Sequence, residues 1–492
     1  MKIFINNHVL NSLLFLCTIL TQADAQSSIS AQIRPRAEMR DGVGRLAPKD
    51  TASAGFVSQR TRLIFNSKLD KVAFGVAIQD VRVWGQDAST INNADGSKLQ
   101  VHEAWAEVNL LDSNGLSIKM GRQELLYDDS RLLGNLDWLQ QGRRHDAAVL
   151  KLNKKGWIVD FGIAFNQNTD AFGKIGTYYT AGNTPPYLAN SKAVLTTIPA
   201  DFVPTAGLGG APNLTFAPST NVGNQMYKTM QFLYAAKKFK ATKVSALIFK
   251  DDFAKFRLDS LGSAANGVIY GRKYDQKGVN SRITLGLLTD GAINKQVKFT
   301  LGGYFQTGKN REGRDLSAYT FTGSLSYTKG KMTVGVGYDY LSGNDQINTS
   351  TTDNRFDPLY GTPHKFWGLM DFFYVGTGAL AGGLSNPFAK LKYVVNPKLS
   401  MVLDVHYFSI ASPMKGSDGK ELSKGLGSEF DFIVNYILNK MTIIELGLCA
   451  GQFTDSMEFT KNGTIGKANQ SPTWAYLMIN IRPEIFSTAI KK

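Results

Sequence analysis

The feature that most constrains the fold of this chain is an alternation of apolar and polar side chains with a period of two residues. In one segment, Leu403, Val405 and Tyr407 alternate with Asp404 and His406. The same pattern recurs in residues 29–40, 157–166, 331–340 and 429–438. Because successive side chains of a β-strand point to opposite faces, each segment predicts a strand with one apolar and one polar face.

The connections between these segments alternate strictly between long and short. Nine long, polar connections occupy residues 41–54, 85–99, 125–142, 167–225, 251–278, 307–315, 343–385, 410–425 and 453–472. Eight short turns lie between them, at Leu69–Lys71, Asp112–Gly115, Asn153–Gly156, Phe239–Thr242, Asp290–Asn294, Lys329–Lys331, Asn396–Lys398 and Asn439–Met441. Nine and eight connections together join 18 strands. The sequence therefore predicts an all-β fold, a transmembrane antiparallel β-barrel of about 18 strands with short periplasmic turns and long extracellular loops.

Soluble all-β folds fit this pattern less well. A β-sandwich rarely needs so many strands in one unit, and its apolar faces all point inward. A propeller has a repeat of about 40 residues with blade signatures, and the sequence shows no such self-similarity. The membrane barrel is therefore the favoured architecture.

Residues 1–25 have the features of a secretory signal peptide. Lys2 supplies the positive start, Val9 to Leu20 contains the apolar core, and Ala23-Asp24-Ala25 is a cleavage site. The apolar run is shorter than the ~18–20 residues of a membrane-spanning helix. We expect export, a mature chain that starts at Gln26, and a single outer-membrane barrel domain over residues 26–492.

The polar faces of the first strands are rich in arginine. The chain has 55 Lys and Arg against 40 Asp and Glu. The arginines concerned are Arg34, Arg36, Arg60, Arg62 and Arg82. A barrel of this size leaves an aqueous channel, and guanidinium groups bind carboxylates at two points. The pattern favours a basic pathway for an anionic solute; the alternative is that these arginines only pair with acids of the lumen wall.

The sequence offers few residues or motifs of the kinds that form catalytic and metal sites. The only cysteines are Cys17 and Cys449, so neither a disulfide framework nor a cysteine zinc site is expected. No two histidines after residue 25 share metal-ligand spacing, and nucleophile-elbow, zinc-protease and phosphate-loop motifs are missing. We expect no catalytic residues, no metal, no cofactor and no nucleic-acid partner. The chain is not expected to be an enzyme.

Two blocks of sequence resemble the bacterial alginate-export outer-membrane porins. The first is Gly121-Arg-Gln-Glu-Leu-Leu-Tyr-Asp-Asp-Ser-Arg131 with its continuation to Trp138, preceded by His102-Glu-Ala-Trp105. The second is Phe356-Asp-Pro-Leu-Tyr-Gly-Thr-Pro-His-Lys-Phe-Trp-Gly-Leu-Met-Asp371, which is similar to a subgroup of relatives of that family. The resemblance implies an 18-stranded barrel whose arginine-rich, acid-flanked constriction passes an acidic polysaccharide passively.

The resemblance also implies roles for particular residues. By motif it points to Arg122, to Glu103 and to the paired acids Asp128 and Asp129. By position on the early strands alone it adds Arg62 and Arg82. The family's long periplasmic plug has no counterpart, because all eight turns here are short. Loop 167–225 or loop 343–385 is the candidate for folding inward instead.

Two functions of different classes remain open from the sequence. The first is a monomeric outer-membrane porin for passive passage of anionic oligosaccharide or polysaccharide, such as alginate. The second is a surface-binding or structural barrel whose lumen is occluded and whose long loops recognise a partner. Outer-membrane lipid and lipopolysaccharide are expected around the barrel in either case.

Overall fold

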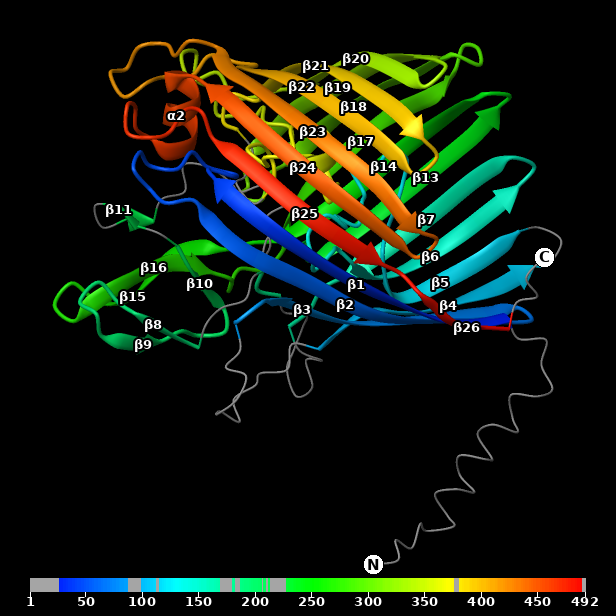
Figure 1. The fold of residues 1–492 in the computed structure, drawn as a ribbon. Coiled ribbons are helices and arrows are strands. Elements are labelled where there is room, and N and C mark those ends of the chain that lie inside the picture. The colour runs from blue at the N-terminus through cyan, green and yellow to red at the C-terminus, as the bar shows by residue number, and fades with distance from the viewer. Residues whose placement is uncertain are drawn as a thin grey trace, which may run out of the picture.

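The computed structural model describes residues 26–86, 99–111, 115–168, 179–181, 186–205, 207–208, 211–212, 227–375 and 380–488. The predicted signal peptide, residues 1–25, lies outside the described residues. Within them, one antiparallel sheet closes on itself to form a barrel (Figure 1).

Eighteen strands form the barrel wall. In chain order they are β1 (Gln26–Asp41), β2 (Ala54–Leu69), β3 (Val72–Val83), β4 (Gln100–Leu111), β5 (Leu116–Gln123), β6 (His145–Lys154), β7 (Trp157–Phe165), β13 (Thr229–Phe239), β14 (Thr242–Ala254), β17 (Val279–Ala292), β18 (Val297–Lys309), β19 (Asp315–Lys329), β20 (Met332–Leu341), β21 (Leu384–Asn396), β22 (Leu399–Ile410), β23 (Gly425–Asn439), β24 (Thr442–Phe453) and β25 (Thr473–Ile481). Strand β1 closes the barrel because it pairs with β2 on one side and with β25 on the other. A short strand, β26 (Glu484–Ser487), follows β25 and also pairs with β1.

The predicted barrel of 18 strands is confirmed. The predicted turns join neighbouring strands at one end of the barrel, as at Leu69, which pairs with Val72. The turn at Asp112–Gly115 lies partly outside the described residues. After Pro483, residues 484–487 continue the wall as β26. The Ala31 amide donates to the Pro483 carbonyl at 3.0 Å, which holds this segment on β1.

The barrel exposes its apolar face outward. Leu301 and Val336 are more than 60% exposed, whereas Asp339 and Glu429 are buried on the inward face. Exposed apolar side chains in every strand are unfavourable in water and favourable in a hydrocarbon layer. The apolar side chains of each strand therefore face the lipid, and the polar side chains face the lumen.

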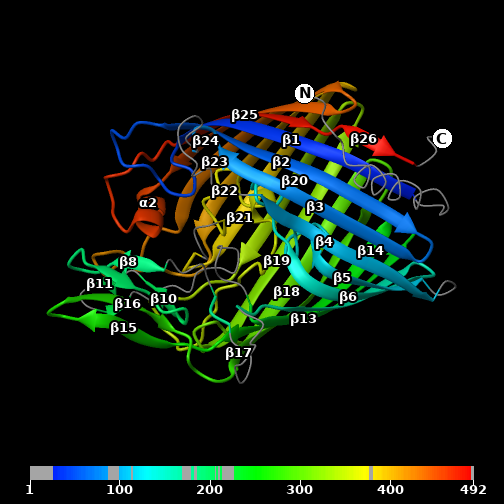
Figure 2. The same cartoon turned by 90° about the horizontal axis from the view of Figure 1, so that it is seen from below.

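Long loops at the other end carry the remaining elements (Figures 1 and 2). The hairpin of β15 (Arg257–Ser263) and β16 (Gly267–Lys273) pairs with β10 (Phe202–Pro204) in a separate side sheet. Two small hairpins, β8 (Tyr187–Ala189) with β9 (Leu195–Thr197) and β11 (Gly207–Leu208) with β12 (Ala211–Pro212), lie in the same region of sequence.

The described helices are short. The 3-10 helix η2 spans Pro363–Lys365, and α2 spans Asp455–Asn462. Helix α2 is capped at its N-terminus by Thr454, whose side chain accepts from the Met457 amide, and at its C-terminus by Gly463, which has a φ of 70°. No helix in the described part of the chain is long and apolar enough to cross a membrane.

The architecture gives a first testable prediction. Protein refolded in detergent should give a β-rich circular dichroism spectrum, and it should migrate faster on gels before boiling than after. The hydrogen-bonded ladder closes on itself, so no open edge is available from which unfolding can start. A helical spectrum, or solubility without detergent, would overturn the assignment.

Candidate functional site in the lumen

Two long loops enter the lumen from the rim. They are the β5–β6 loop (124–144) and the β20–β21 loop (342–383). Inside the barrel Leu133 forms a parallel bridge with Tyr360, and the Gly134 amide donates to the Tyr360 carbonyl at 3.0 Å. The Tyr360 hydroxyl donates to Asp251 of β14 at 2.9 Å. Of the two loops expected as inward-folding candidates, 343–385 enters the lumen, whereas strand β10 of 167–225 pairs with the side sheet.

Asp137 fixes the β5–β6 loop to β1 and β2. Its carboxylate lies 2.8 Å from Arg60 Nη2, 3.1 Å from Arg34 Nη1 and 3.8 Å from Arg62 Nη1. These arginines converge because Arg34 pairs directly with Arg60, and Arg62 lies two residues further on the same face. Burial by itself raises the pKa of Asp137, but Arg60 and Arg34 bring it below its ordinary value. One loop carboxylate thus offsets the repulsion among three arginines.

Neutral amides satisfy most of the other donors of these arginines. Gln140 Oε1 accepts from Arg34 at 3.0 and 3.1 Å, and Gln32 Oε1 accepts from Arg60 at 2.8 Å. Arg62 Nε donates to Gln79 at 2.7 Å. The arginines therefore contact the loop and the wall rather than open solvent in the lumen.

Arg36 belongs to the same face but has other partners. It donates to Glu38 at 2.8 Å and to the Trp138 carbonyl at 2.9 Å. Its guanidinium carbon lies 4.0 Å from the centre of the Trp138 ring, a cation–π contact. The other loop joins here, since the ring of His364 stacks on Trp138 with centres 4.3 Å apart.

The far end of the β5–β6 loop reaches the opposite wall. Asp128 accepts from Tyr234 at 2.7 Å and from Ser245 at 2.9 Å, on β13 and β14. Arg131 donates to Asp339 of β20 at 2.9 Å and lies 3.4 Å from Asp129. The loop therefore crosses the lumen from β1–β2 to β13–β14 and β20.

The β20–β21 loop is anchored by acids of the wall. The Met370 amide donates to Glu429 at 2.8 Å, and the Leu369 amide donates to Asp431 at 3.2 Å. Lys461 of α2 donates to the Phe372 carbonyl, and burial lowers the pKa of Lys461 to about 7. An apolar core fills the space around these anchors; it includes Phe356, Trp367, Met370, Phe372, Phe373 and Tyr374.

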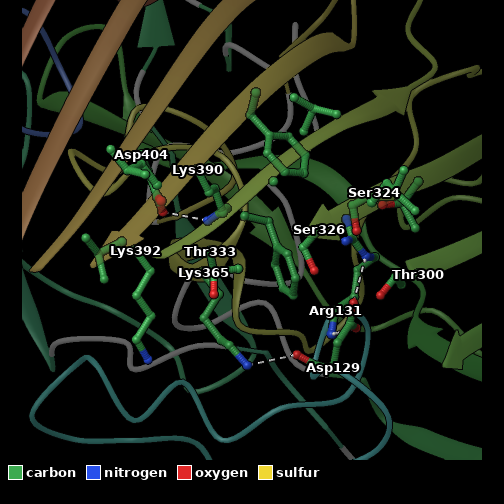
Figure 3. Close-up of a pocket in the computed structure, with 18 residues that line it drawn as sticks. Asp129, Arg131, Thr300, Ser324, Ser326, Thr333, Lys365, Lys390, Lys392 and Asp404 are labelled. Atoms are coloured by element: carbon green, nitrogen blue, oxygen red, sulfur yellow. Dashed lines mark hydrogen bonds and ion pairs between the residues drawn. The ribbon is translucent and has the colours of Figure 1, made fainter. Parts of the chain in front are cut away.

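A cavity of about 430 Å³ lies beside the two loops, against the inner face of β18 to β22 (Figure 3). Its polar lining comprises Asp129, Arg131, Thr300, Thr322, Ser324, Ser326, Thr333, Lys365, Lys390, Lys392 and Asp404. Lys390 is paired with Asp404 at 2.5 Å, whereas Lys365 donates to the carbonyl oxygen of Asp129 at 3.1 Å. Lys392 has no carboxylate partner among the described residues. The cavity thus contains more basic than acidic side chains.

The structure places most of the sequence-predicted residues around these loops. Arg34, Arg36, Arg60 and Arg62 meet the β5–β6 loop at one end, and Asp128 and Asp129 lie at its other end. Glu103 lies at the root of the loop, where its carboxylate accepts from the Glu124 amide at 3.3 Å.

Strand alternation places Arg82 and Arg122 on the outward-facing side of the wall, and Arg82 also borders a pocket together with Arg36 and Gln140. Their assignment to the pore lining stays a prediction. The β2–β3 pairing is continuous, so Arg82 shares the outward face of Phe74 and pairs with Asp80 at 2.6 Å. The pairing of β3 with β4 contains a register shift between Ala77 and Ile78.

Arg122 is bound to Asp146 at 2.9 and 3.0 Å. Asp146 is exposed between buried His145 and Ala147, and strand alternation therefore places the Arg122–Asp146 pair outside.

Sequence reasoning missed the groups that complete the lumen. Asp137 falls inside the Gly121–Trp138 block. Its only signal in the sequence is that it is a further acid after the expected pair Asp128 and Asp129. Lys365 lies in the second resembling block, and Lys390 and Lys392 alternate along one polar strand face. That alternation was available as a signal.

The closed wall, the inward loops and the lumen cavity define a porin-type β-barrel. Solved structures with the same fold support this class. OccK11 (OpdR) of Pseudomonas aeruginosa has a TM-score of 0.55 at 12% identity, with 94% of this chain and 97% of that chain covered. OccAB4 of Acinetobacter baumannii has a TM-score of 0.55 at 11% identity, with coverages of 94% and 99%. OpdK of Pseudomonas aeruginosa, determined with vanillate, has a TM-score of 0.52 at 11% identity, with coverages of 94% and 99%.

The particular family indicated is that of alginate export. The sequence model described as "Alginate export" matches residues 25–164, which confirms the resemblance inferred from the Gly121–Trp138 and His102–Trp105 blocks. The block at 356–371 lies outside the match. No curated protein matches the chain significantly. The matched region is similar to the alginate-export family, and the fold is similar to that of the OccK and Opd barrels.

Proposed function

We propose that this barrel allows passive diffusion of anionic oligosaccharides or polysaccharides of the alginate type across the outer membrane. The observation that carries the proposal is the lumen cavity, in which basic side chains outnumber acidic ones. Lys365 and Lys392 can attract a carboxylate, while Ser324, Ser326 and Thr333 can bind sugar hydroxyls. Such weak, repeated contacts suit passage better than one tight site.

The dimensions favour short oligosaccharides over a polymer. A cavity of about 430 Å³ is in the range of small-molecule sites. The β5–β6 and β20–β21 loops cross the lumen beside it, so a long chain passes only if they move. OpdK, which shares the fold, has been determined with vanillate, itself a small carboxylate. Phe366 and Phe388 give the cavity an apolar surface beside its polar groups.

An occluded barrel is the second candidate. It is favoured by the apolar core inside the lumen, where Tyr360, Met370 and Phe372 are fully buried. In that function the long loops bind a partner at the cell surface. Conductance separates the two candidates, because an occluded barrel passes almost no ions.

The proposal also includes the export of the chain, its single barrel domain and the role of the arginines of β1 and β2. Residues 1–25 direct export and are removed, and residues 26–492 act as one monomeric barrel surrounded by lipid and lipopolysaccharide. Arg34, Arg36, Arg60 and Arg62 shape the field of the lumen through the β5–β6 loop. No chemical step is assigned to the chain.

Neutralising the cavity lysines should lower anion selectivity. In the double variant Lys365→Gln and Lys392→Gln, the anion-over-cation permeability ratio should fall several-fold in dilute salt. The effect should shrink in molar salt, where the Debye length is ~3 Å. Reversal potentials in planar bilayers measure this ratio.

Two variants serve as controls. Lys295→Gln removes a charge from the turn between β17 and β18, and Arg122→Gln removes one from the outer face; both should leave the reversal potential unchanged. A double variant with the selectivity of the unaltered protein in dilute salt contradicts the anion pathway.

A further inference from the structure

Three buried arginines lie around Glu312, where β16, the β18–β19 loop and the β20–β21 loop come together. Arg272 comes from β16, Arg311 from the β18–β19 loop (310–314) and Arg355 from the β20–β21 loop. They are 8%, 7% and 6% exposed. The loops are joined by Asn310, which donates to Asp353 at 2.8 Å.

Each of these arginines keeps one nitrogen without a hydrogen-bond partner among the residues that the structure describes. Arg355 is bound at two points by Asp353, at 2.8 Å each, but its Nη1 is unpaired. Arg311 has a single long side-chain bond of 3.4 Å to the Tyr274 hydroxyl, and its Nη1 is also unpaired. Arg272 lies 3.6 Å from Glu312, and its Nε is unpaired. Buried nitrogens without acceptors are rare and require an explanation.

The charges of the cluster do not balance. Three arginines face Asp353 and Glu312, and the Asp353 carboxylate is used by Arg355, Asn310 and Asn344. A third acid, Asp357, also acts on Arg355, but it forms an ion pair with Arg282 at 2.9 Å. Burial raises the pKa of Glu312, which weakens it as a counter-charge despite nearby Arg272. Burial, followed by the charge of Arg311, lowers the pKa of Arg272, so the two guanidinium groups repel each other. The cluster is therefore short of negative charge.

We propose that Arg272, Arg311 and Arg355 form a binding site for one compact oxyanion, a phosphate, sulfate or carboxylate group, enclosed by the three loops. Planar guanidinium groups match such oxygens in geometry and charge. The anion accepts hydrogen bonds from the unpaired nitrogens and offsets the repulsion between the arginines. Because its contacts come from three loops, binding should stabilise their packing. The proposal does not depend on transport through the lumen.

Equilibrium binding to the full, detergent-folded barrel tests the proposal. Inorganic phosphate, sulfate and glucuronate are titrated by calorimetry and by thermal melting at constant ionic strength, with chloride as the balancing anion. At least one of them should bind saturably with one site per chain and raise the melting temperature. Preference for phosphate or sulfate assigns the site to a small inorganic ion or a headgroup phosphate; preference for glucuronate assigns it to a sugar acid at the channel mouth.

Variants locate the binding site. Arg311→Gln should weaken binding about tenfold or more, the effect of losing one charge-assisted hydrogen bond. Arg314→Gln is the control, since Arg314 lies in the same loop and donates to the carbonyls of Ser350 and Thr351. If Arg311→Gln fails to fold, selenate soaked into crystals of the unaltered protein should give an anomalous peak among the three arginines. Lack of saturable binding by all three anions, or equal binding in both variants, overturns the proposal.

Discussion

Replacing residues 345–380 with a four-residue Gly-Ser linker should raise the single-channel conductance several-fold. This segment carries Trp367, Met370 and Phe372, which are buried inside the barrel. Removing them widens the open cross-section, on which ionic conductance depends. A short linker suffices because the ends of the loop are adjacent: the Asn344 amide donates to the Ala381 carbonyl at 2.8 Å.

The wall should survive this deletion, at some loss of stability. The strands keep their own hydrogen-bonded ladder, but Glu429 and Asp431 lose the amides of Met370 and Leu369. Buried carboxylates without donors are costly, so melting should occur at a lower temperature. Heat-modifiable migration confirms that the barrel is closed before its conductance is recorded.

A matched deletion is available on the other side of the mouth. Ala254 of β14 pairs with Val279 of β17, so the β15–β16 hairpin between them is also replaceable by a short linker. That hairpin belongs to the side sheet and not to the lumen, and its removal should leave conductance close to its original value. Equal conductance of the unaltered protein and the 345–380 deletion would show that this loop does not limit flow.

The wall of this protein was predictable because its signals are local. A strand with one face in lipid requires alternation with period two, and a tight turn requires polar or flexible residues at fixed places. Both are visible without knowledge of the partner strand. For this reason the predicted turns at Leu69–Lys71 and Asn396–Lys398 separate the observed strands β2 and β3, and β21 and β22.

The lumen was less predictable because its contacts join distant residues. Asp137 and Arg34 are 103 positions apart, and no local pattern shows that the loop turns inward to bring them together. The face of Arg82 is also hard to predict, because the pairing of β3 shifts register against β4 while its pairing with β2 stays continuous. A two-residue period gives the face only while the register is unbroken.

The largest effect on selectivity is expected from Asp137→Asn. The change removes the carboxylate that contacts Arg34 and Arg60 but keeps the size of the side chain. Glu124 and Glu103 then remain as the acids near Arg62. The lumen field becomes more positive, and the anion-over-cation permeability ratio should rise several-fold in dilute salt and little in molar salt. Stability should fall by about 1–3 kcal/mol, less than for a fully buried pair, because the Asp137 side chain is 36% exposed.

Reversal potential and melting of the same variant separate two roles of the arginines. If they act on permeating ions, both quantities change; if they only hold the loop, melting falls while selectivity stays constant. Asp418→Asn is the control, because Asp418 is an exposed loop acid whose carboxylate accepts only the Lys420 amide among the described residues. It removes the same charge far from Asp137 in sequence, and it should change neither quantity. An unaltered reversal potential for Asp137→Asn in dilute salt would restrict Arg34, Arg60 and Arg62 to fixing the β5–β6 loop, and the lysines of the cavity would then have to account for any anion preference.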